Sequence, residues 1–265
     1  MALTETIGSA TINGLAYIGG LARLAAASLR AVFVEPFRGQ RFDVSRVIHQ
    51  AMAVGVEALP IVSLISFFIG TILALDAAYE LRKLGAMQLV ASTVAIAITR
   101  ELGPLMTAVV VLSRSGSAFA AEIGTMKVNE EIDALETMAL EPVDFLVAPK
   151  FLAMVVMVPC LTVWADFMGV LGGGAFGVLA ASFTWGSYIQ ATLVALKSPD
   201  ITNGLIKAAM FGLVITAVGC QEGFSTGLGS EQVGRSTTSA VVKSTLMVVV
   251  VDLIFTTIFY FTSTR

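Results

Sequence analysis

Charged residues are scarce in this 265-residue sequence. Asp, Glu, Lys and Arg make up 13% of it, whereas hydrophobic residues make up 56%. Soluble globular domains carry about 25% charged residues. The net charge of −3 gives no basis for a nucleic-acid partner. This balance is typical of an integral membrane protein, and the length suits a single all-α helical bundle.

Residues that carry chemistry are also few. The chain has one histidine, His49, and two cysteines, Cys160 and Cys220, both in apolar runs. No CxxC motif or Cys/His cluster indicates a metal site or a disulfide. The Gly-x-x-x-x-Gly-Lys-Ser/Thr phosphate loop, the Gly-x-Ser-x-Gly elbow and the HExxH motif are absent too. We therefore expect no enzyme, no metal and no cofactor in this chain.

Long hydrophobic runs dominate instead. A bilayer core takes roughly 20 apolar residues per helix. Five runs meet that need: about Ala51–Ala77, Ala86–Ser113, a run that begins near Phe151, Ile201–Gln221 and Ala240–Phe261. The sequence therefore predicts five membrane spans, with an interfacial segment over Tyr188–Asp200.

The stretch Thr4–Val34 before the first span has a helical period. Its apolar residues recur at three- and four-residue steps, and Arg23 and Arg30 fall seven residues apart on one face. This pattern predicts an amphipathic helix that lies in the membrane interface. An ordinary packed helix is a nearly equal alternative. The short basic connector Phe37–Arg46 follows.

Two adjacent charges interrupt the second span. Arg100 and Glu101 follow 16 uncharged residues, and 12 more come after them, beginning with Leu102-Gly103-Pro104. Neither half alone spans a bilayer, so both charges fall within the membrane, where ionisable residues by default mark a functional site. A pair that only neutralises itself is the alternative, although adjacent helical residues point about 100° apart. We expect Gly103-Pro104 to kink or break this helix.

Four more ionisable residues lie in the apolar runs: Glu57, Asp166, Lys207 and Asp252. Lys207 and Asp252 lie on consecutive spans and could pair across them.

Residues 113–150 form the longest polar excursion. Its acidic residues include Glu122, Glu130, Glu131, Asp133 and Glu136, and apolar residues follow a helical stripe among them. This pattern predicts an amphipathic helix at the membrane surface, over about residues 117–138, with an acidic outer face. A plain solvated helix is the alternative, and we favour a docking element.

Basic residues predict the orientation. With the N-terminus in the cytoplasm, ten of the 16 Lys and Arg residues fall on cytoplasmic segments, four fall outside and two lie within the membrane. Because cytoplasmic loops carry an excess of Lys and Arg, we expect a cytoplasmic N-terminus and a periplasmic C-terminus. The 113–150 and 223–239 segments are then cytoplasmic.

Several motifs resemble the signature of the MlaE/YrbE permeases. They are Arg100-Glu101-Leu102-Gly103-Pro104, Ser113-Arg114-Ser115-Gly116-Ser117-Ala118, Ala121-Glu122-Ile123-Gly124-Thr125-Met126-Lys127-Val128, Glu131-Ile132-Asp133-Ala134-Leu135 and Thr237-Thr238-x-Ala240-Val241-Val242-x-Ser244. The resemblance runs from about Ile48 to Phe261. It implies the membrane subunit of a lipid-moving ABC transporter: an N-terminal interfacial helix and connector over 1–47, then a five-span permease domain over 48–265.

The resemblance also implies partners. They are a second permease copy, most simply in a homodimer, a cytoplasmic ABC ATPase that carries ATP and Mg, a periplasmic MCE-domain protein and a phospholipid. The setting would be the bacterial inner membrane, in the service of outer-membrane lipid homeostasis.

Three sets of site residues follow from the resemblance. Functional charges of the lipid pathway would be Arg100, Glu101, Lys207 and Asp252. The lipid cavity would involve Ile69, Leu73, Leu75, Tyr79 and Met247. ATPase coupling would use Glu122, Gly124, Lys127, Glu130, Glu131 and Asp133. The stretches Leu75-Asp76-Ala77-Ala78-Tyr79 and Gln221-Glu222-Gly223-Phe224 depart from the phospholipid members of the family, which leaves the exact lipid open.

Two other functions compete with the ABC permease. An ion-coupled secondary carrier would use Glu101, Asp166 and Asp252 as proton or cation sites, but five spans do not divide into two inverted repeats. A membrane scaffold without transport would have no need of buried charges.

Overall fold

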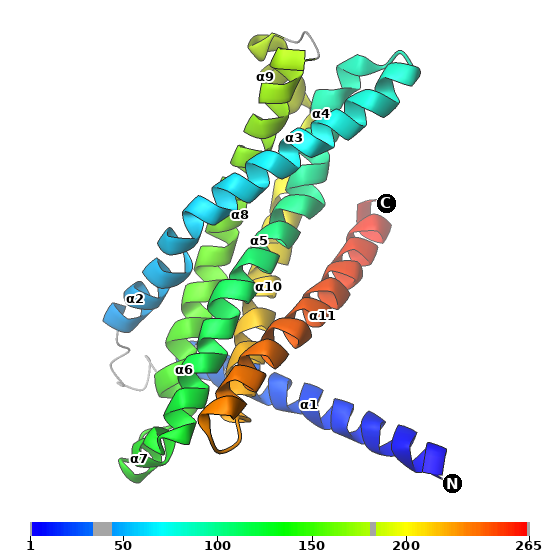
Figure 1. Ribbon diagram of the computed structural model, residues 1–265. Helices are drawn as coiled ribbons and strands as arrows, with labels where there is room; N and C mark the ends of the chain where they lie inside the picture. Colours follow the sequence, from blue (N-terminus) through cyan, green and yellow to red (C-terminus); the bar gives the residue numbers. More distant parts are fainter. Residues whose placement is uncertain (1, 34–43, 181–183, 264–265) are drawn as a thin grey trace.

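The computed structural model describes residues 2–33, 44–180 and 184–263, and Figure 1 shows their arrangement. All regular elements in these ranges are helical. The α-helices are α1 (Ala2–Phe33), α2 (Val44–Val54), α3 (Leu59–Lys83), α4 (Val90–Ala97), α5 (Gly103–Val111), α6 (Ser117–Val128), α7 (Glu131–Thr137), α8 (Ala148–Ala180), α9 (Trp185–Ala195), α10 (Ser198–Phe224) and α11 (Ser230–Ser263). The 3₁₀ turns η2 (Val56–Ala58) and η3 (Met87–Leu89) and the π-helical turns η4 (Ile98–Leu102), η5 (Leu112–Gly116) and η6 (Val143–Val147) join several of them. Most of the predicted basic connector lies outside the described residues.

Five stretches of the described chain are long and apolar enough to cross a membrane, as predicted. They are Val44–Lys83, Met87–Val128, Val143–Leu179, Ser198–Phe224 and Ser230–Thr262. Each is longer than expected because the polar ends stay helical beyond the apolar run. The fifth span begins at Ser230 rather than Ala240, so most of the predicted 223–239 loop is helix. The predicted interfacial segment Tyr188–Asp200 is α9 together with the first turn of α10.

Of the kink or break predicted at Gly103-Pro104, the break is wrong. The second span runs helically from Met87 through Val128. The π-helical turn η4 comes directly before Gly103, and Pro104 sits in the first turn of α5. A proline lacks the backbone N–H that an interior helical position donates, and it is tolerated at the start of a helical segment. The changed bonding of η4 therefore lets the helix continue past the proline.

Small residues bring α3 and α8 into close contact. A Cβ atom at Gly70 would lie 1.9 Å from the carbonyl oxygen of Gly169, and one at Gly172 would lie 2.0 Å from that of Phe67. The Thr71 hydroxyl donates to the Gly172 carbonyl oxygen at 3.1 Å. Close backbone approach through small residues and interhelical hydrogen bonds are typical of membrane helices. Glycine is required at both positions.

The core extends along α5, α6, α8 and α10. Fully buried side chains such as Leu112, Met154, Leu161 and Phe211 fill it. A smaller cluster joins α3 to α4 near α9. In Figure 1, α9 and the α3–α4 turn lie at one end of the bundle, and α1, α6 and α7 lie at the other. The segments predicted to share the cytoplasmic side therefore do share one end.

Helix α1 is partly packed and partly exposed. Leu21, Leu24 and Ser28 are buried against the bundle, whereas Ile12 and Leu15 are exposed. Figure 1 shows the helix reaching away from the bundle at the end that carries α6 and α7. The second half of the helix packs, and its first half presents apolar side chains outward. An interfacial position of the helix stays a prediction.

Helix α11 is the least covered span. Only 11% of its most apolar window is buried, compared with 28–61% for the other four spans. Figure 1 shows it leaning away from the bundle along much of its length. One chain alone therefore leaves a long apolar helix face without protein cover.

Candidate functional site

The π-helical turn η4 presents Arg100 and Glu101 to different partners on α10. Arg100 Nε donates to Asp200 Oδ1 at 2.6 Å, and Lys207 Nζ donates to Glu101 Oε2 at 2.6 Å. The two partners are seven residues apart, two helical turns along α10. Adjacent residues that diverge around a helix can each reach one of them. Both charges are therefore paired across helices and not with each other.

Lys207 is the centre of this arrangement. Its side chain is 1% exposed, and Nζ also donates to the Thr256 hydroxyl on α11 at 2.7 Å. Asp252 Oδ1, also on α11, lies 3.0 Å from Nζ, so the expected pairing of Lys207 with Asp252 is present. Within the described chain this oxygen accepts no bond of full hydrogen-bond geometry, so the contact is an ion pair at short range. Three helical segments thus converge on one ammonium group.

We call these five charged residues the charged cluster: Arg100, Glu101, Asp200, Lys207 and Asp252. It holds two cations and three carboxylates. Charges taken out of water need well-placed partners, and every member has one here. The Glu101 side chain keeps 40% of its surface exposed and that of Asp252 keeps 19%. Arg100 and Glu101 are therefore the most accessible members of the cluster, and Lys207 and Asp200 are its buried members.

Asp200 and Thr256 were missed by sequence reasoning. The sequence places Asp200 at the end of a predicted interfacial segment, but its Oδ2 accepts from the Lys197 backbone N–H at 3.1 Å and caps the start of α10. Pro199 followed by an acidic residue in a first turn is a helix-start signal that could have placed it. Thr256 lies one helical turn after Asp252. A threonine in an apolar run indicates a site residue more weakly than a charged residue does.

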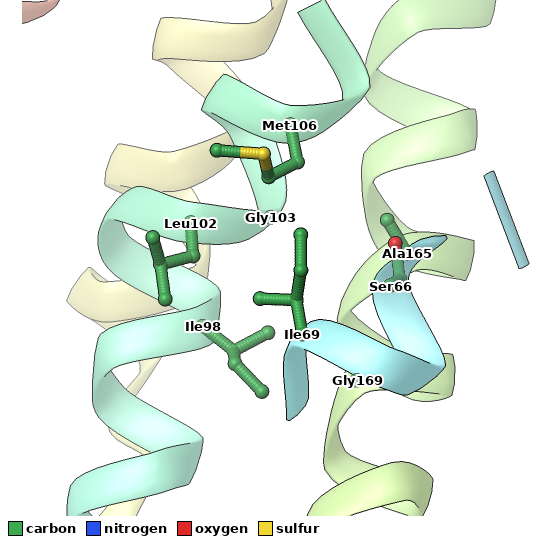
Figure 2. Close-up of a pocket in the computed structure, with 8 residues that line it drawn as sticks. All are labelled: Ser66, Ile69, Ile98, Leu102, Gly103, Met106, Ala165 and Gly169. Atoms are coloured by element: carbon green, nitrogen blue, oxygen red, sulfur yellow. The ribbon is translucent and has the colours of Figure 1, made fainter. Parts of the chain in front are cut away.

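Ile69, one of the predicted cavity residues, lines a recess in the described part of the chain. Figure 2 shows this recess between α3, α8 and the second span, with Ile69 reaching towards them. It is lined by Ser66, Ile69, Ile98, Leu102, Gly103, Met106, Ala165 and Gly169. It is small, and its lining is mostly apolar. This recess, as the described residues form it, is too small to hold a lipid.

The other four predicted cavity residues are dispersed. Leu75 and Tyr79 are exposed on α3, and Lys83 Nζ lies 4.0 Å from the Tyr79 ring centroid. Leu73 packs in the small cluster near α9, and Met247 packs against the main core. A cavity that uses all five would need surfaces beyond this single chain, so these residues stay a prediction.

The carboxyl group of Asp166 lies beside the recess. A Cβ atom at Gly103 would lie 1.8 Å from Asp166 Oδ1, so a side chain there would displace this carboxyl group. Among the described residues, this buried oxygen has no hydrogen-bond partner. Asp166 is therefore separate from the charged cluster.

The predicted coupling helix over about 117–138 is two helices. Helix α6 ends at Val128, and α7 begins at Glu131. Glu130 between them adopts a left-handed backbone with φ of 60°. That conformation cannot continue an α-helix, so the chain turns at this point. Because of this turn, the predicted coupling residues do not share the face of a single helix.

Three of the predicted coupling residues contact the bundle. Lys150 Nζ, 2% exposed, donates to Glu122 Oε2 at 2.7 Å. A Cβ atom at Gly124 would lie 2.7 Å from the Thr226 hydroxyl oxygen, and Lys127 donates to the Phe224 carbonyl oxygen. The other three, Glu130, Glu131 and Asp133, are exposed on the turn and the first part of α7. We call these three the acidic triad, and with Glu136, which is also exposed on α7, they form an open acidic face.

Known proteins are similar to this chain along most of its length. Residues 47–258 match the protein family described as Permease MlaE. The chain belongs to the MlaE permease family. A probable ABC transporter permease protein of Rickettsia felis is 33% identical over 258 residues, covering 97% of this chain and 98% of the relative. The chain is thus a membrane subunit of an ABC transporter, and ATP hydrolysis lies in a separate subunit.

Two other relatives in the family carry more specific names. The intermembrane phospholipid transport system permease protein MlaE of Haemophilus influenzae is 35% identical over 215 residues, covering 81% of this chain and 82% of the relative. The chloroplastic protein TRIGALACTOSYLDIACYLGLYCEROL 1 of Arabidopsis thaliana is 32% identical over 213 residues, covering 80% of this chain and 61% of the relative. The predicted family, all-α fold and permease role are confirmed.

Proposed function

We propose that this chain forms the membrane pathway of a phospholipid transporter. It would move lipid between the bacterial inner membrane and a periplasmic MCE-domain carrier, and so serve outer-membrane lipid homeostasis. The observation that carries the proposal is the similarity along 82% of the Haemophilus permease named for phospholipid transport. ABC permease relatives that cover nearly the whole chain support the same class.

An amphiphile suits the chemistry of the charged cluster. Its most exposed groups are Arg100 and Glu101, and Asp252 lies on α11, whose outer face is apolar. A head group could meet charge there while acyl chains lie on aliphatic side chains. The Nε of Arg100 is bound to Asp200, and the other guanidinium N–H groups could bind a lipid phosphate. The functional role of the charges thus involves Arg100 as well as Lys207 and its two acidic partners.

A symmetric pair of permeases is part of the proposal. Helix α11 is 11% buried over its apolar window, and it carries Asp252 and Thr256 of the site. A second copy packed along this helix would cover it and place two charged clusters around one space. Most soluble oligomers are closed symmetric homo-oligomers, and the same rule of self-complementary surfaces favours a homodimer here. Cavity residues dispersed on one chain could then face one another.

We infer that the acidic triad faces the ATPase. It lies at the end of the bundle that holds α1, where the excess of Lys and Arg predicts the cytoplasm. The N-terminus would be cytoplasmic and the C-terminus periplasmic. Helices α6 and α7 would transmit ATPase motion, because α6 packs firmly on α10 while the triad stays open.

Native purification in mild detergent tests the proposal. Mass spectrometry of the complex should find an ATPase, an MCE-domain protein and bound phospholipid, and transfer of labelled phospholipid from vesicles to the MCE protein should require ATP. A complex that holds lipid but no MCE-domain protein would overturn the proposed transfer of lipid to that protein. A lone chain whose transport follows an ion gradient would instead support the ion-coupled carrier, which family membership disfavours.

A further inference from the structure

A buried carboxylate stands at the end of α10, far from the charged cluster. The Glu222 side chain is 7% exposed. It accepts from Lys243 Nζ at 2.7 and 2.8 Å and from the Ser239 hydroxyl at 2.5 Å, both on α11. Lys243 is itself partly exposed, with 44% of its side-chain surface accessible. These contacts of Glu222 with Ser239 and Lys243, which we call the charged joint, therefore tie the last turn of α10 to the first half of α11.

The same turn of α10 is seated against α6. A Cβ atom at Gly223 would lie 2.7 Å from the Ile123 side chain, so only glycine fits there. Thr226 lies against Gly124 and donates to the Ser236 hydroxyl at 2.9 Å. Together with the Lys127 bond to the Phe224 carbonyl oxygen, these contacts leave α6 little room to move alone. Residues 222–226 thus contact α6 on one side and α11 on the other.

Helix α1 also contacts the charged joint. Lys243 Nζ lies 4.6 Å from the centre of the Tyr17 ring, a cation–π contact. A Cβ atom at Gly20 would come within 3.2 Å of the Gln221 side chain. Burial and the neighbouring Glu222 carboxylate raise the pKa of Tyr17, which keeps the phenol neutral. Three elements, α1, α6 and α11, therefore meet at one turn of α10.

We propose that Glu222, through its bond to Lys243, is the positioning residue that transmits motion of α6 to α11. The inference rests on the proposed function, since it assigns a role within ATP-driven lipid transport. The outer face of α11 is largely uncovered, and its inner face packs on α6 and α10. Ion pairs tie α11 to α10 at Asp252 and at Lys243, and of these two the Lys243 pair is the one beside α6. A buried ion pair is a weak source of stability, and its best-attested use is to fix register between helices. Glu222 and Lys243 fix the register of the helix that carries Asp252.

The test removes the joint without leaving an orphan charge. Glu222→Gln with Lys243→Met neutralises both partners at similar volume, so the complex should still fold and assemble. An exposed ion pair at the far end, Lys83 with Glu80, supplies the matched control through Lys83→Met with Glu80→Gln. ATP hydrolysis and phospholipid transfer are measured together on each complex in nanodiscs. The readout is lipid moved per ATP hydrolysed.

The neutral pair at Glu222 and Lys243 should hydrolyse ATP at the wild-type rate but move at least about fivefold less lipid per ATP, the lower range of allosteric coupling. The reversed pair, Glu222→Lys with Lys243→Glu, should recover part of that loss, which a purely structural defect would not show. An unchanged ratio would overturn the proposal, as would loss of assembly in the neutral pair. If the wild-type complex itself moves no phospholipid, the proposed function fails instead.

Discussion

Removing the ammonium group of Lys207 tests the charged cluster most directly. In Lys207→Met the side chain keeps nearly its length but loses Nζ, which lies 2.6 Å from Glu101 Oε2 and 3.0 Å from Asp252 Oδ1. Both carboxylates then lose their cation, and the Thr256 hydroxyl loses its donor. The variant therefore isolates the electrostatic contribution of one atom.

The size of the effect follows from the burial. Removing one partner of a buried ion pair costs about 3–5 kcal/mol. The Lys207 side chain is 1% exposed, but that of Glu101 is 40% exposed, so water screens part of the loss. We expect a cost of about 3 kcal/mol, near the lower end of that range. In domains of comparable size each kcal/mol lowers Tm by about 2–4 °C, which predicts a decrease of about 6–12 °C.

Thermal unfolding in mild detergent measures this decrease, with Lys83→Met as the control for loss of an exposed lysine. A triple variant, Lys207→Met with Glu101→Gln and Asp252→Asn, removes the orphan charges as well. It should recover most of the lost stability yet move no lipid, if the charges serve transport. A Lys207→Met protein that melts with the wild type would refute the electrostatic reasoning. A transporting triple variant would refute the functional role.

Three further outcomes test the packing, the docking surface and the region around α9. Gly70→Ala should lower the melting temperature, because its Cβ would lie 1.9 Å from the Gly169 carbonyl oxygen, whereas Gly186→Ala meets nothing within 4 Å and should melt as wild type. Equal melting of both would contradict the close α3–α8 contact. Lysine at all three positions of the acidic triad should leave the permease folded but reduce the amount of ATPase that copurifies; undiminished ATPase would remove the docking role. Burial raises the pKa of Tyr188 from 10.0 to about 12. The neutral phenol therefore stabilises the fold fully below about pH 10, and this contribution is lost as the pH rises towards 12. Circular dichroism should show a smaller alkaline loss in Tyr188→Phe, and identical curves would contradict this.

Membrane spans were predictable because their signal is a simple physical requirement. Every backbone polar group in a bilayer must be satisfied within the helix, so an apolar run long enough to cross predicts a helix by itself. The ends were not predictable in the same way. Residues 113–128 are rich in polar side chains yet continue the second span as helix, because helices extend into water without penalty when their outer faces are polar.

The site was predictable in its charges but not in its connections. An ionisable residue in an apolar run is visible in the sequence, which is how Lys207 and Asp252 were found. Which carboxylate a buried lysine reaches depends on the rotation of helices that are far apart in sequence. Asp200 is 100 residues from Arg100, and Thr256 is 49 residues from Lys207. No local pattern encodes those distances. The ion pairs of Glu122 with Lys150 and of Glu222 with Lys243 were not predicted for the same reason.

The Arg100-Glu101-Leu102-Gly103-Pro104 motif combines charges that are visible in the sequence with contacts that only the folded chain shows. Pro104 lacks a backbone N–H donor, and the preceding turn is π-helical, a geometry that is frequent at functional sites. Gly103 leaves room for the Asp166 carboxyl group, which a Cβ would displace. The same turn sends Arg100 and Glu101 to partners two helical turns apart on α10. The motif therefore shapes the helix and places its charges together, so a substitution at Gly103 should disturb the ion pairs of Glu101 without touching them directly.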